Sequence, residues 1–564
     1  MSTYWPEGLP RSLTYPDVTV GHLSAAAARL YGDRAAVVDG DQTLSFGRLH
    51  EEACAFAHAL HADGVGRGDV VLLHLSNSLW FLVAYYGTLQ SGASVSMANP
   101  LQPVAGLRAQ LTDTGAVVAV TEQNQARTLS DARTGSALKT VVVMPPTACS
   151  PADGPGPVSG PGVVEFAAFT AGRPTAPPPV TVTGEDVAHL AYTGGTTGVA
   201  KGVRVLHRNV VANVTQMVVW RASHLPVSDS AGTLTLLPMV GSDDPGVRPG
   251  AATTIVVSPL FHAHALINAN FLLLCGTTHV LGGRFSPDAL VDAIERHRAT
   301  YVTGSPTMWH ALVDVPGIDK RDLTSVRVIS SGAAPIDRTT LDALQHAFPS
   351  AVVAEGYGLT EATCLVSANP VLRGHTGEPG SVGLPMFDTT VEIRAAEDPA
   401  VLLGPHEVGE LWVKGPQVTA GYLNNPQATA EQFVGGWLRT GDLGYLDSDG
   451  LLFLVGRAKD MLIYKGYNVY PRELEDLLVR HPGVAAAAVV GRRDARVGQE
   501  PVAFVVPKQG ALLDAQEVMS YVSKNVVPYK KIRAIHLVDE LPTSAAGKVM
   551  KNELTQRANN GSGH

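Results

Sequence analysis

The sequence predicts an α/β protein with a small β-rich subdomain and a final α+β domain. Helix-like and strand-like segments alternate from Val18 to Thr121, which is typical of a largely parallel sheet. Short alternating strands with turn residues follow from Thr390. From about Lys459 onward, two helical and two strand patterns form a section large enough for a separate domain.

Each element is predicted from the spacing of its apolar residues. Helical spacing predicts helices over 49–60, 80–90, 209–220, 290–297, 471–480 and 515–525. Apolar or alternating runs predict strands over 69–75, 116–121, 187–191, 253–259, 301–304, 326–330, 352–354, 391–394, 409–414, 485–490 and 501–506. Two Pro- and Gly-rich stretches are predicted to be irregular, an exposed connector over 145–181 and a surface insertion over 223–250.

Length and composition restrict the class of protein. A chain of 564 residues is too long for one compact core, so roughly three or four structural units are expected. With 45% hydrophobic and 16% charged residues the chain should be globular, and its longest apolar stretch, 265–275, is too short to span a bilayer. A net charge of −9 offers no basic face to nucleic acid.

The cysteines and the first residues indicate the compartment. Cys54, Cys149, Cys275 and Cys364 are far apart and form no C-x-x-C pair, which argues against a disulfide scaffold and against a zinc site. We expect them to be reduced and buried. The segment MSTYWPEGLP has no secretory-signal pattern, so a cytoplasmic location is expected.

Residues 192–202, YTGGTTGVAKG, form the strongest candidate binding loop. Glycine lets backbone N–H groups approach an anion, threonine hydroxyls add donors, and Lys201 supplies a mobile positive charge. The spacing is not that of a G-x-x-x-x-G-K-[ST] loop, so a different polyphosphate-binding fold is predicted. The alternative is a flexible Gly/Thr surface loop, because loops of this composition are common.

Several predicted strands end in loops that contain glycine or a polar residue. Ligands of open α/β sheets bind beyond the carboxyl ends of the strands. Tyr192, His262, Gly332 and Tyr357 follow or end such strands and are therefore candidates for one shared pocket.

Six motifs occur in one order: YTGGTTGVAKG, SGAAP, EGYGLTE, LRTGDLGYLDSDG, GRAKDMLIYKGYNVYPRELE and PTSAAGK. In this series the chain closely resembles the adenylate-forming superfamily of acyl-CoA synthetases and aryl-CoA ligases. The resemblance implies a large N-terminal domain over 1–458, with two α/β sheets and a small β subdomain. It also implies a small mobile α+β domain over 459–564.

The resemblance further implies a role for each motif residue. The β- and γ-phosphates of ATP would be held by Thr193, Gly194, Gly195, Thr196, Thr197, Gly198 and Lys201. The adenine slot would comprise Gly332, Ala333, Ala334 and Pro335, with Glu355, Gly356, Tyr357 and Gly358 in the adjoining motif. Thr360 would touch the α-phosphate, Glu361 would hold Mg²⁺, and Asp442 and Arg457 would bind the ribose.

Four further motif residues belong to the C-terminal domain. By resemblance, Lys459 is the hinge, and Lys548 bridges the carboxylate and the α-phosphate. Lys465 and Gly466 lie in the loop expected to line the path of the thiol. Two departures from the family pattern are seen, Gly194 where serine is common and Ala200 where proline is common. We expect these to loosen ATP binding without abolishing activity.

The segment FHAHALIN is predicted to line the acid pocket. His262 matches the family's gate beside the carboxylate. If the segment is helical, His264 and Asn268 lie at i and i+4 on one face and would suit a hydroxy- or amino-bearing aryl acid. The alternatives are a metal-binding H-x-H pair, for which no third ligand cluster is apparent, and a face that packs in the core with its polar atoms satisfied.

The predicted activity is ATP- and Mg²⁺-dependent ligation of an aryl or medium- to long-chain acid to CoA, with release of AMP and pyrophosphate. A carboxylate attacking a phosphate is an anion meeting an anion, so a cation placed between them lowers the barrier. Three alternatives stay open: transfer to a carrier-protein thiol or an amine, activation of another oxyanion such as nitrite for diazotisation, and an adenylate-binding pseudoenzyme.

Overall fold

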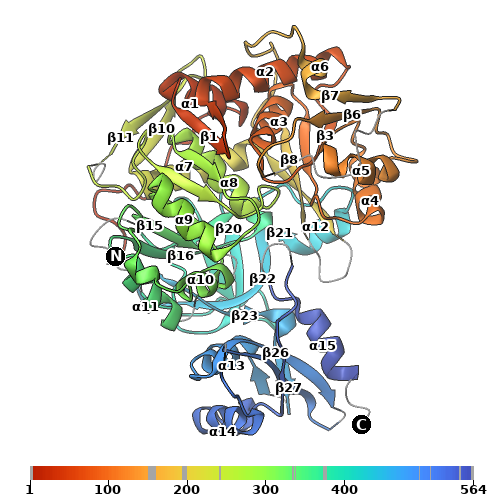
Figure 1. Ribbon diagram of the computed structural model, residues 1–564. Coiled ribbons are helices and arrows are strands. Elements are labelled where there is room, and N and C mark those ends of the chain that lie inside the picture. The colour runs from red at the N-terminus through yellow and green to blue at the C-terminus, as the bar shows by residue number, and fades with distance from the viewer. Residues whose placement is uncertain are drawn as a thin grey trace.

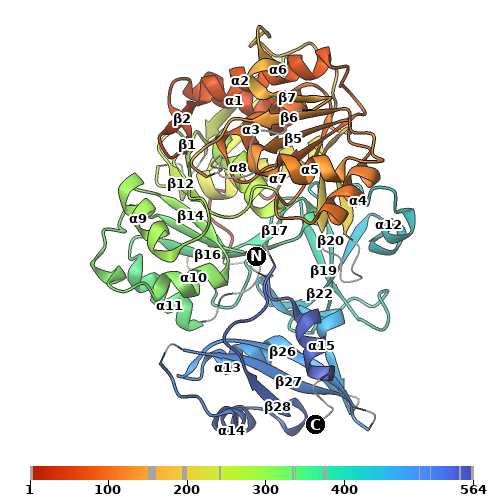
Figure 2. The same ribbon diagram turned by 45° about the vertical axis from the view of Figure 1, so that its right-hand side comes forward.

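The computed structural model describes residues 4–149, 160–193, 200–239, 243–332, 336, 338–371, 378–465, 467–494, 496–508, 510–544 and 548–560. The chain up to about residue 458 builds a large body around three main sheets, and the C-terminal part forms a smaller body below it (Figures 1 and 2). Among the described residues, no helix is long and apolar enough to cross a membrane.

The first sheet has seven strands in the order β7-β6-β5-β3-β4-β8-β9. Neighbouring strands are parallel except for β8 and β9, which are antiparallel. Residues 194–200 are too few for the crossover that a parallel pair needs. The strands are β3 (Val70–His74), β4 (Ser94–Met97), β5 (Val118–Glu122), β6 (Thr140–Met144), β7 (Val163–Glu165), β8 (Val187–Thr193) and β9 (Lys201–Leu206).

The second sheet has nine strands in the order β18-β17-β16-β15-β14-β12-β13-β1-β2, with antiparallel strands added at both ends of a parallel centre. The strands are β1 (Ala35–Asp39), β2 (Gln42–Ser45), β12 (Thr253–Val256), β13 (Thr278–Leu281), β14 (Tyr301–Gly304), β15 (Val328–Ser331), β16 (Val352–Gly358), β17 (Leu365–Ala368) and β18 (Leu384–Pro385). Because β12, β14, β15 and β16 are parallel, the loops after them meet at one edge of the sheet.

Helices cover both sheets (Figure 1). Two of them pack against each other and are buried along almost their whole length, α7 (His207–Ala222) and α8 (Ala263–Leu274). Such burial on all sides is expected for a helix between layers. The others of the large body are α1 (Gly21–Tyr31), α2 (Phe46–Ala62), α3 (Leu79–Gln90), α4 (Val104–Thr114), α5 (Ala126–Ala132), α6 (Phe166–Thr170), α9 (Pro287–His297), α10 (Pro306–Val313), α11 (Arg338–Ala347) and α12 (Pro426–Gln432).

The β subdomain is an antiparallel sheet of β19 (Thr390–Arg394), β20 (Gly409–Lys414), β21 (Phe433–Val434), β22 (Trp437–Leu446) and β23 (Leu452–Arg457). Strand β23 leads directly into a short 3₁₀ turn, η4 (Ala458–Asp460). The chain passes from the large body to the small one at this turn.

The C-terminal body has its own sheet and its own core, which contains Leu474, Val505 and Val518. A side-chain hydrogen bond links it to the large body, in which Arg472 Nη1 donates to the Leu454 carbonyl of β23 at 2.9 Å. Its elements are β24 (Leu462–Tyr464), β25 (Tyr467–Val469), α13 (Pro471–Val479), β26 (Val484–Asp494), β27 (Gly498–Pro507), α14 (Ala515–Asn525), β28 (Ala534–Leu537) and α15 (Lys551–Asn560).

The predicted fold class is confirmed, and three local predictions are wrong. The connector predicted over 145–181 contains β7 and α6, because Val163, Val164 and Phe166 pack against the sheet and core despite the Pro-rich surroundings. The insertion predicted over 223–250 contains the hairpin of β10 (His224–Ser228) and β11 (Leu234–Pro238). The four cysteines are free, but Cys149 is half-buried.

Gly358, at the end of β16, tests how closely the backbone is packed at this end of the second sheet. A Cβ at Gly358 would stand 1.6 Å from the Cys364 carbonyl oxygen, which is backbone and cannot turn away. We predict that Gly358→Ala destabilises the large body by about 2 kcal/mol or more and lowers its Tm by on the order of 5 °C. Gly456→Ala is the matched control, because nothing lies within 4 Å of its Cβ. Equal melting temperatures for the two variants would contradict this packing.

Candidate functional site

Two strands of the β subdomain place a carboxylate opposite a guanidinium. Asp442 on β22 pairs with Arg457 on β23, and their side chains lie 3.3 Å apart. The Tyr357 hydroxyl, from the end of β16, donates to Asp442 Oδ2 at 2.6 Å. Burial raises the pKa of Tyr357, and the Asp442 charge raises it further. The phenol therefore keeps its proton and acts as the donor to the Asp442 carboxylate.

A second carboxylate, that of Glu361, lies in the turn that follows β16. Glu361 lies in the 3₁₀ turn η3 (Thr360–Ala362), and its Oε1 accepts a hydrogen bond from the Tyr422 hydroxyl at 2.8 Å. The Glu361 carbonyl accepts from both the N–H and the hydroxyl of Thr419, at 3.0 and 2.9 Å. Thr363, directly after the turn, has φ of 62°, a conformation that a β-branched residue rarely adopts. Such strain is typical of functional loops.

The base of the predicted phosphate loop lies beside this turn. Thr193 and Lys201 face each other across β8 and β9. Lys201 Nζ lies 5.1 Å from the centre of the Tyr422 ring, so one tyrosine contacts both Lys201 and Glu361. The Gly202 carbonyl accepts from the Leu423 N–H at 2.7 Å, which fastens β9 to the segment that carries Tyr422.

Lys548 reaches into the same region from the C-terminal body. Its backbone is held by Ser544, whose N–H donates to the Lys548 carbonyl at 2.8 Å. Burial and the Arg457 charge lower the pKa of the Lys548 ammonium, whereas the Asp442 and Glu361 carboxylates raise it. Lys548 therefore stands among charged groups of the large body, although its side chain keeps contact with solvent.

Two histidines at the start of α8 stand nearby. Burial, and then the Lys548 charge, lower the pKa of His262 to about 4. Burial, and then the charges of Arg221 and Lys548, lower the pKa of His264 to about 4. Both rings are therefore neutral near pH 7. His264 Nε2 lies 3.1 Å from the Thr303 hydroxyl, whereas the buried Nε2 of His262 has no hydrogen-bond partner.

Gly332, directly after β15, lies against His264. A Cβ at Gly332 would meet the His264 ring at 3.2 Å, so the position favours glycine. Glu355 on β16 accepts from the Ile336 N–H at 2.9 Å and so holds the far end of the loop after β15. Gly356 is also close-packed, because its Cβ would come within 3.1 Å of the Ser367 carbonyl oxygen.

Several predicted residues are not part of this cluster. Tyr192 was predicted to share the pocket, but its hydroxyl donates to Asp113 of α4. Both polar ends of Asn268 are already bonded, to the His264 carbonyl at 2.8 Å and to the Tyr301 hydroxyl at 3.1 Å. Lys465 lies on the turn between β24 and β25, where its N–H donates to the Val497 carbonyl. Gly194, Gly195, Thr196, Thr197, Gly198, Ala333, Ala334, Pro335 and Gly466 lie outside the described residues.

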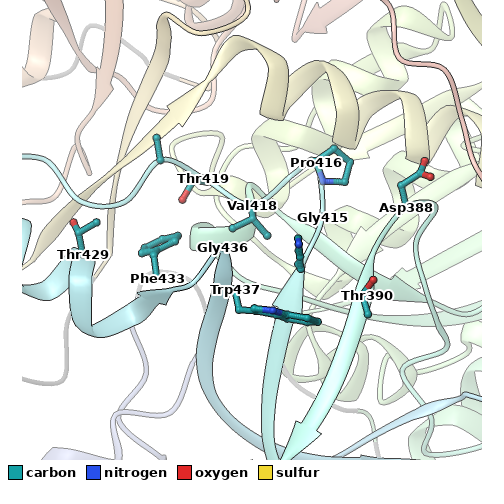
Figure 3. A pocket seen from close by; sticks show the side chains of 12 residues that line it. Asp388, Thr390, Gly415, Pro416, Val418, Thr419, Thr429, Phe433, Gly436 and Trp437 are labelled. Carbon is teal, nitrogen blue, oxygen red and sulfur yellow. The ribbon is translucent and has the colours of Figure 1, made fainter. Parts of the chain in front are cut away.

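The sequence analysis missed Tyr422 and Thr419, because no local pattern marks a residue that acts by contacting a distant loop. Thr419 also lines a pocket of about 620 Å³ in the β subdomain, together with Phe433 and Trp437 (Figure 3). Within the described residues, no three His, Cys, Asp or Glu side chains gather as candidate metal ligands. The arrangement can bind an anion between Lys201 and Lys548 and can offer carboxylates to hydroxyls or to one cation.

Comparisons with known proteins show which proteins the chain is similar to. A family model described as AMP-binding enzyme matches residues 24–423, and one described as AMP-binding enzyme C-terminal domain matches 473–548. A 4-coumarate–CoA ligase of Oryza sativa subsp. japonica is 34% identical over 507 residues, 88% of this chain and 84% of that protein. A benzoate CoA ligase from Burkholderia xenovorans has a TM-score of 0.79 at 25% identity, covering 95% of this chain and 100% of the other. An amide bond synthetase from Marinactinospora thermotolerans has a TM-score of 0.80 at 26% identity, covering 95% and 99%.

The two site histidines predict an acid-sensitive fold. An unfolded histidine binds a proton near pH 6.5, whereas His262 and His264 resist one until about pH 4. Between these pH values the unfolded chain binds more protons than the folded protein. The contribution of the two histidines to the free energy of unfolding is therefore fully present above pH 6.5 and is lost as the pH falls toward 4. Each histidine contributes a slope of up to about 1.4 kcal/mol per pH unit.

This slope is measured as Tm against pH from 7 to 4.5, in the wild type and in a His262→Gln/His264→Gln double variant. We expect the double variant to lose the part of the pH dependence of stability that corresponds to the uptake of about two protons on unfolding. Parallel curves for the two proteins would show that these rings titrate normally.

Proposed function

The chain belongs to the AMP-binding enzyme family, and we propose that it is an ATP-dependent ligase that joins an aryl acid to CoA through an acyl-adenylate, releasing AMP and pyrophosphate. The observation that carries the proposal is Lys548, a cation of the C-terminal body that stands among Arg457, Asp442 and Glu361 of the large body.

The chemistry requires such a cation. In the first step a carboxylate oxygen attacks the α-phosphorus and pyrophosphate leaves, so negative charge accumulates where two anions already meet. A fixed ammonium at that point stabilises the transition state more than the separated reactants. Thr360 and Lys201 would hold the phosphates around it, and Asp442 would accept the ribose hydroxyls while Tyr357 and Arg457 orient the carboxylate.

The residues also suit Mg²⁺. This ion binds through one or two carboxylates, substrate phosphates and water, so a three-carboxylate cage is not required. Glu361 has one oxygen engaged by Tyr422, which fixes its direction and leaves the other for a cation. When bound, the ion would neutralise phosphate charge.

CoA is the proposed acyl acceptor, since the curated relative named above is a CoA ligase. An amine is the second candidate, because the amide bond synthetase has the same fold at 26% identity. Acid-dependent ATP/pyrophosphate exchange over a panel of aryl acids tests the first step. Product mass spectrometry with CoA, with an amine or with neither then identifies the acceptor. No exchange with any acid would reject the proposal.

The first-step role of Lys548 is testable by separating the two half-reactions. We predict that Lys548→Ala lowers pyrophosphate exchange by about 100- to 1,000-fold, because one preorganised electrostatic donor is worth that much. Thioester formation from supplied acyl-adenylate should stay near the wild-type rate, because no second anion must then approach the phosphate. A variant that retained more than about half of the wild-type exchange would refute the assignment.

The hinge proposed at Lys459 is testable with proline. Lys459 lies in the 3₁₀ turn η4, whose backbone φ a proline tolerates, so Lys459→Pro should fix the orientation that brings Lys548 to the site. We predict that pyrophosphate exchange is largely retained and that most thioester formation is lost, because the C-terminal body must rotate to admit the thiol.

Lys459→Ala is the matched control for this variant. It removes the same charge but leaves φ free, and we expect it to run both half-reactions. If the proline variant formed thioester at near the wild-type rate, neither the hinge at this residue nor a two-state C-terminal domain built on it would stand.

A further inference from the structure

Arg221, at the C-terminal end of α7, is a buried cation without a carboxylate partner among the described residues. The residue is 3% exposed. Its Nη1 donates to the hydroxyls of Tyr301 and of Ser330, the latter at 3.3 Å. The rings of Phe271 and Tyr301 lie 5.7 and 5.6 Å from the guanidinium carbon. The buried Nε has no hydrogen-bond partner.

Such a group is costly to the fold. Hydroxyls and aromatic faces offset part of the energy that a cation loses on leaving water, but they bring no opposite charge. Burial lowers the pKa of Arg221 to about 10, and this value still leaves it charged near pH 7. An apolar side chain of similar volume would stabilise the same space better. The retained charge therefore points to a ligand that supplies the missing anion.

The contacts of Arg221 lead to the acid-binding end of α8. Tyr301, which accepts from Arg221, donates to Asn268 Oδ1 at 3.1 Å. Asn268 lies one helical turn, about 6 Å, beyond His264. His264 experiences the charges of both Arg221 and Lys548. Helices α7 and α8 lie side by side in this region (Figure 1). The contacts therefore run from Arg221 through Tyr301 and Asn268 toward His264, and Arg221 is the member of this series farthest from Lys548.

We propose that Arg221 binds a second carboxylate at the far end of the substrate, so that the acid is an aryl dicarboxylate. One carboxylate would meet Lys548 and become adenylated, and the other would form a bidentate pair with the guanidinium. The aromatic ring between the two carboxylates would lie along the stretch of α8 from His264 to Asn268. This inference rests on the proposed function, because it assumes that an acid is activated beside Lys548.

Cinnamate and two of its para-substituted derivatives test the charge at the far end. 4-Carboxycinnamate carries the second anion, 4-nitrocinnamate has nearly the same shape without net charge there, and cinnamate has neither. We expect the dicarboxylate to have a kcat/KM at least about tenfold above that of the nitro acid in pyrophosphate exchange. Arg221→Met should lower the value for the dicarboxylate by about 100-fold and leave the other two acids within about threefold.

Arg327→Met is the matched control. Arg327 immediately precedes β15, the strand that carries Ser330, but it pairs with Asp244. This variant should lose stability and keep the preference among acids. Arg221→Met should instead keep or raise the Tm of the free protein, because it removes an unpaired buried charge. In the wild type 4-carboxycinnamate without ATP should raise the Tm, and in Arg221→Met it should not.

The outcomes separate the two proposals. Exchange with cinnamate or 4-nitrocinnamate as good as with the dicarboxylate, unchanged in Arg221→Met, would overturn the second-carboxylate site and leave the ligase proposal intact. An Arg221-dependent Tm rise with cinnamate would also overturn it, because the single carboxylate would then sit at the far end. No exchange with any acid, together with an Arg221-dependent Tm rise with the dicarboxylate, would reject the ligase and keep the anion site.

Discussion

The whole arrangement depends on one ammonium group that is delivered from another domain. Lys548 belongs to the C-terminal body, yet the charges that set its pKa, those of Arg457, Asp442 and Glu361, belong to the large body. A cation held in this way acts on the site only in one orientation of the two bodies. The few contacts across the boundary, such as that of Arg472 with the Leu454 carbonyl, are of the kind that can be exchanged when the orientation changes.

The proposed acid site contains few positively charged groups. The protein carries a net charge of −9, so anionic substrates must be held by a small number of local cations. His262 and His264 contribute none near pH 7, because burial keeps them neutral. If Lys548 and Arg221 each bind one carboxylate, as proposed above, the charges of the acid fix its orientation between them.

The sequence was sufficient for the fold class, for most long elements and for the residues of the charged cluster. Apolar spacing located α2, α3 and α14, because each buries one face or all faces along an uninterrupted stretch. Asp442 and Arg457 were predicted from their motifs, and the β22–β23 register shows that the two residues are direct neighbours. Composition failed at β7 and α6, where Val163 and Phe166 pack against distant residues within a Pro-rich segment. Tyr422 and Arg221 could not be found at all, since their significance comes from contacts more than sixty residues away in the chain.

The central claim is that a carboxylate of the acid attacks the α-phosphorus of ATP beside Lys548. The most direct test follows one oxygen atom of that carboxylate into the product. The enzyme is incubated with ATP, CoA and an aryl acid labelled with ¹⁸O in both carboxylate oxygens, and the released AMP is weighed by mass spectrometry. If the acid is adenylated and the thiol then attacks its carbonyl carbon, the oxygen that joined carbon to phosphorus leaves with the phosphate. The account predicts AMP that carries one ¹⁸O; AMP without the label, formed together with product, would contradict it.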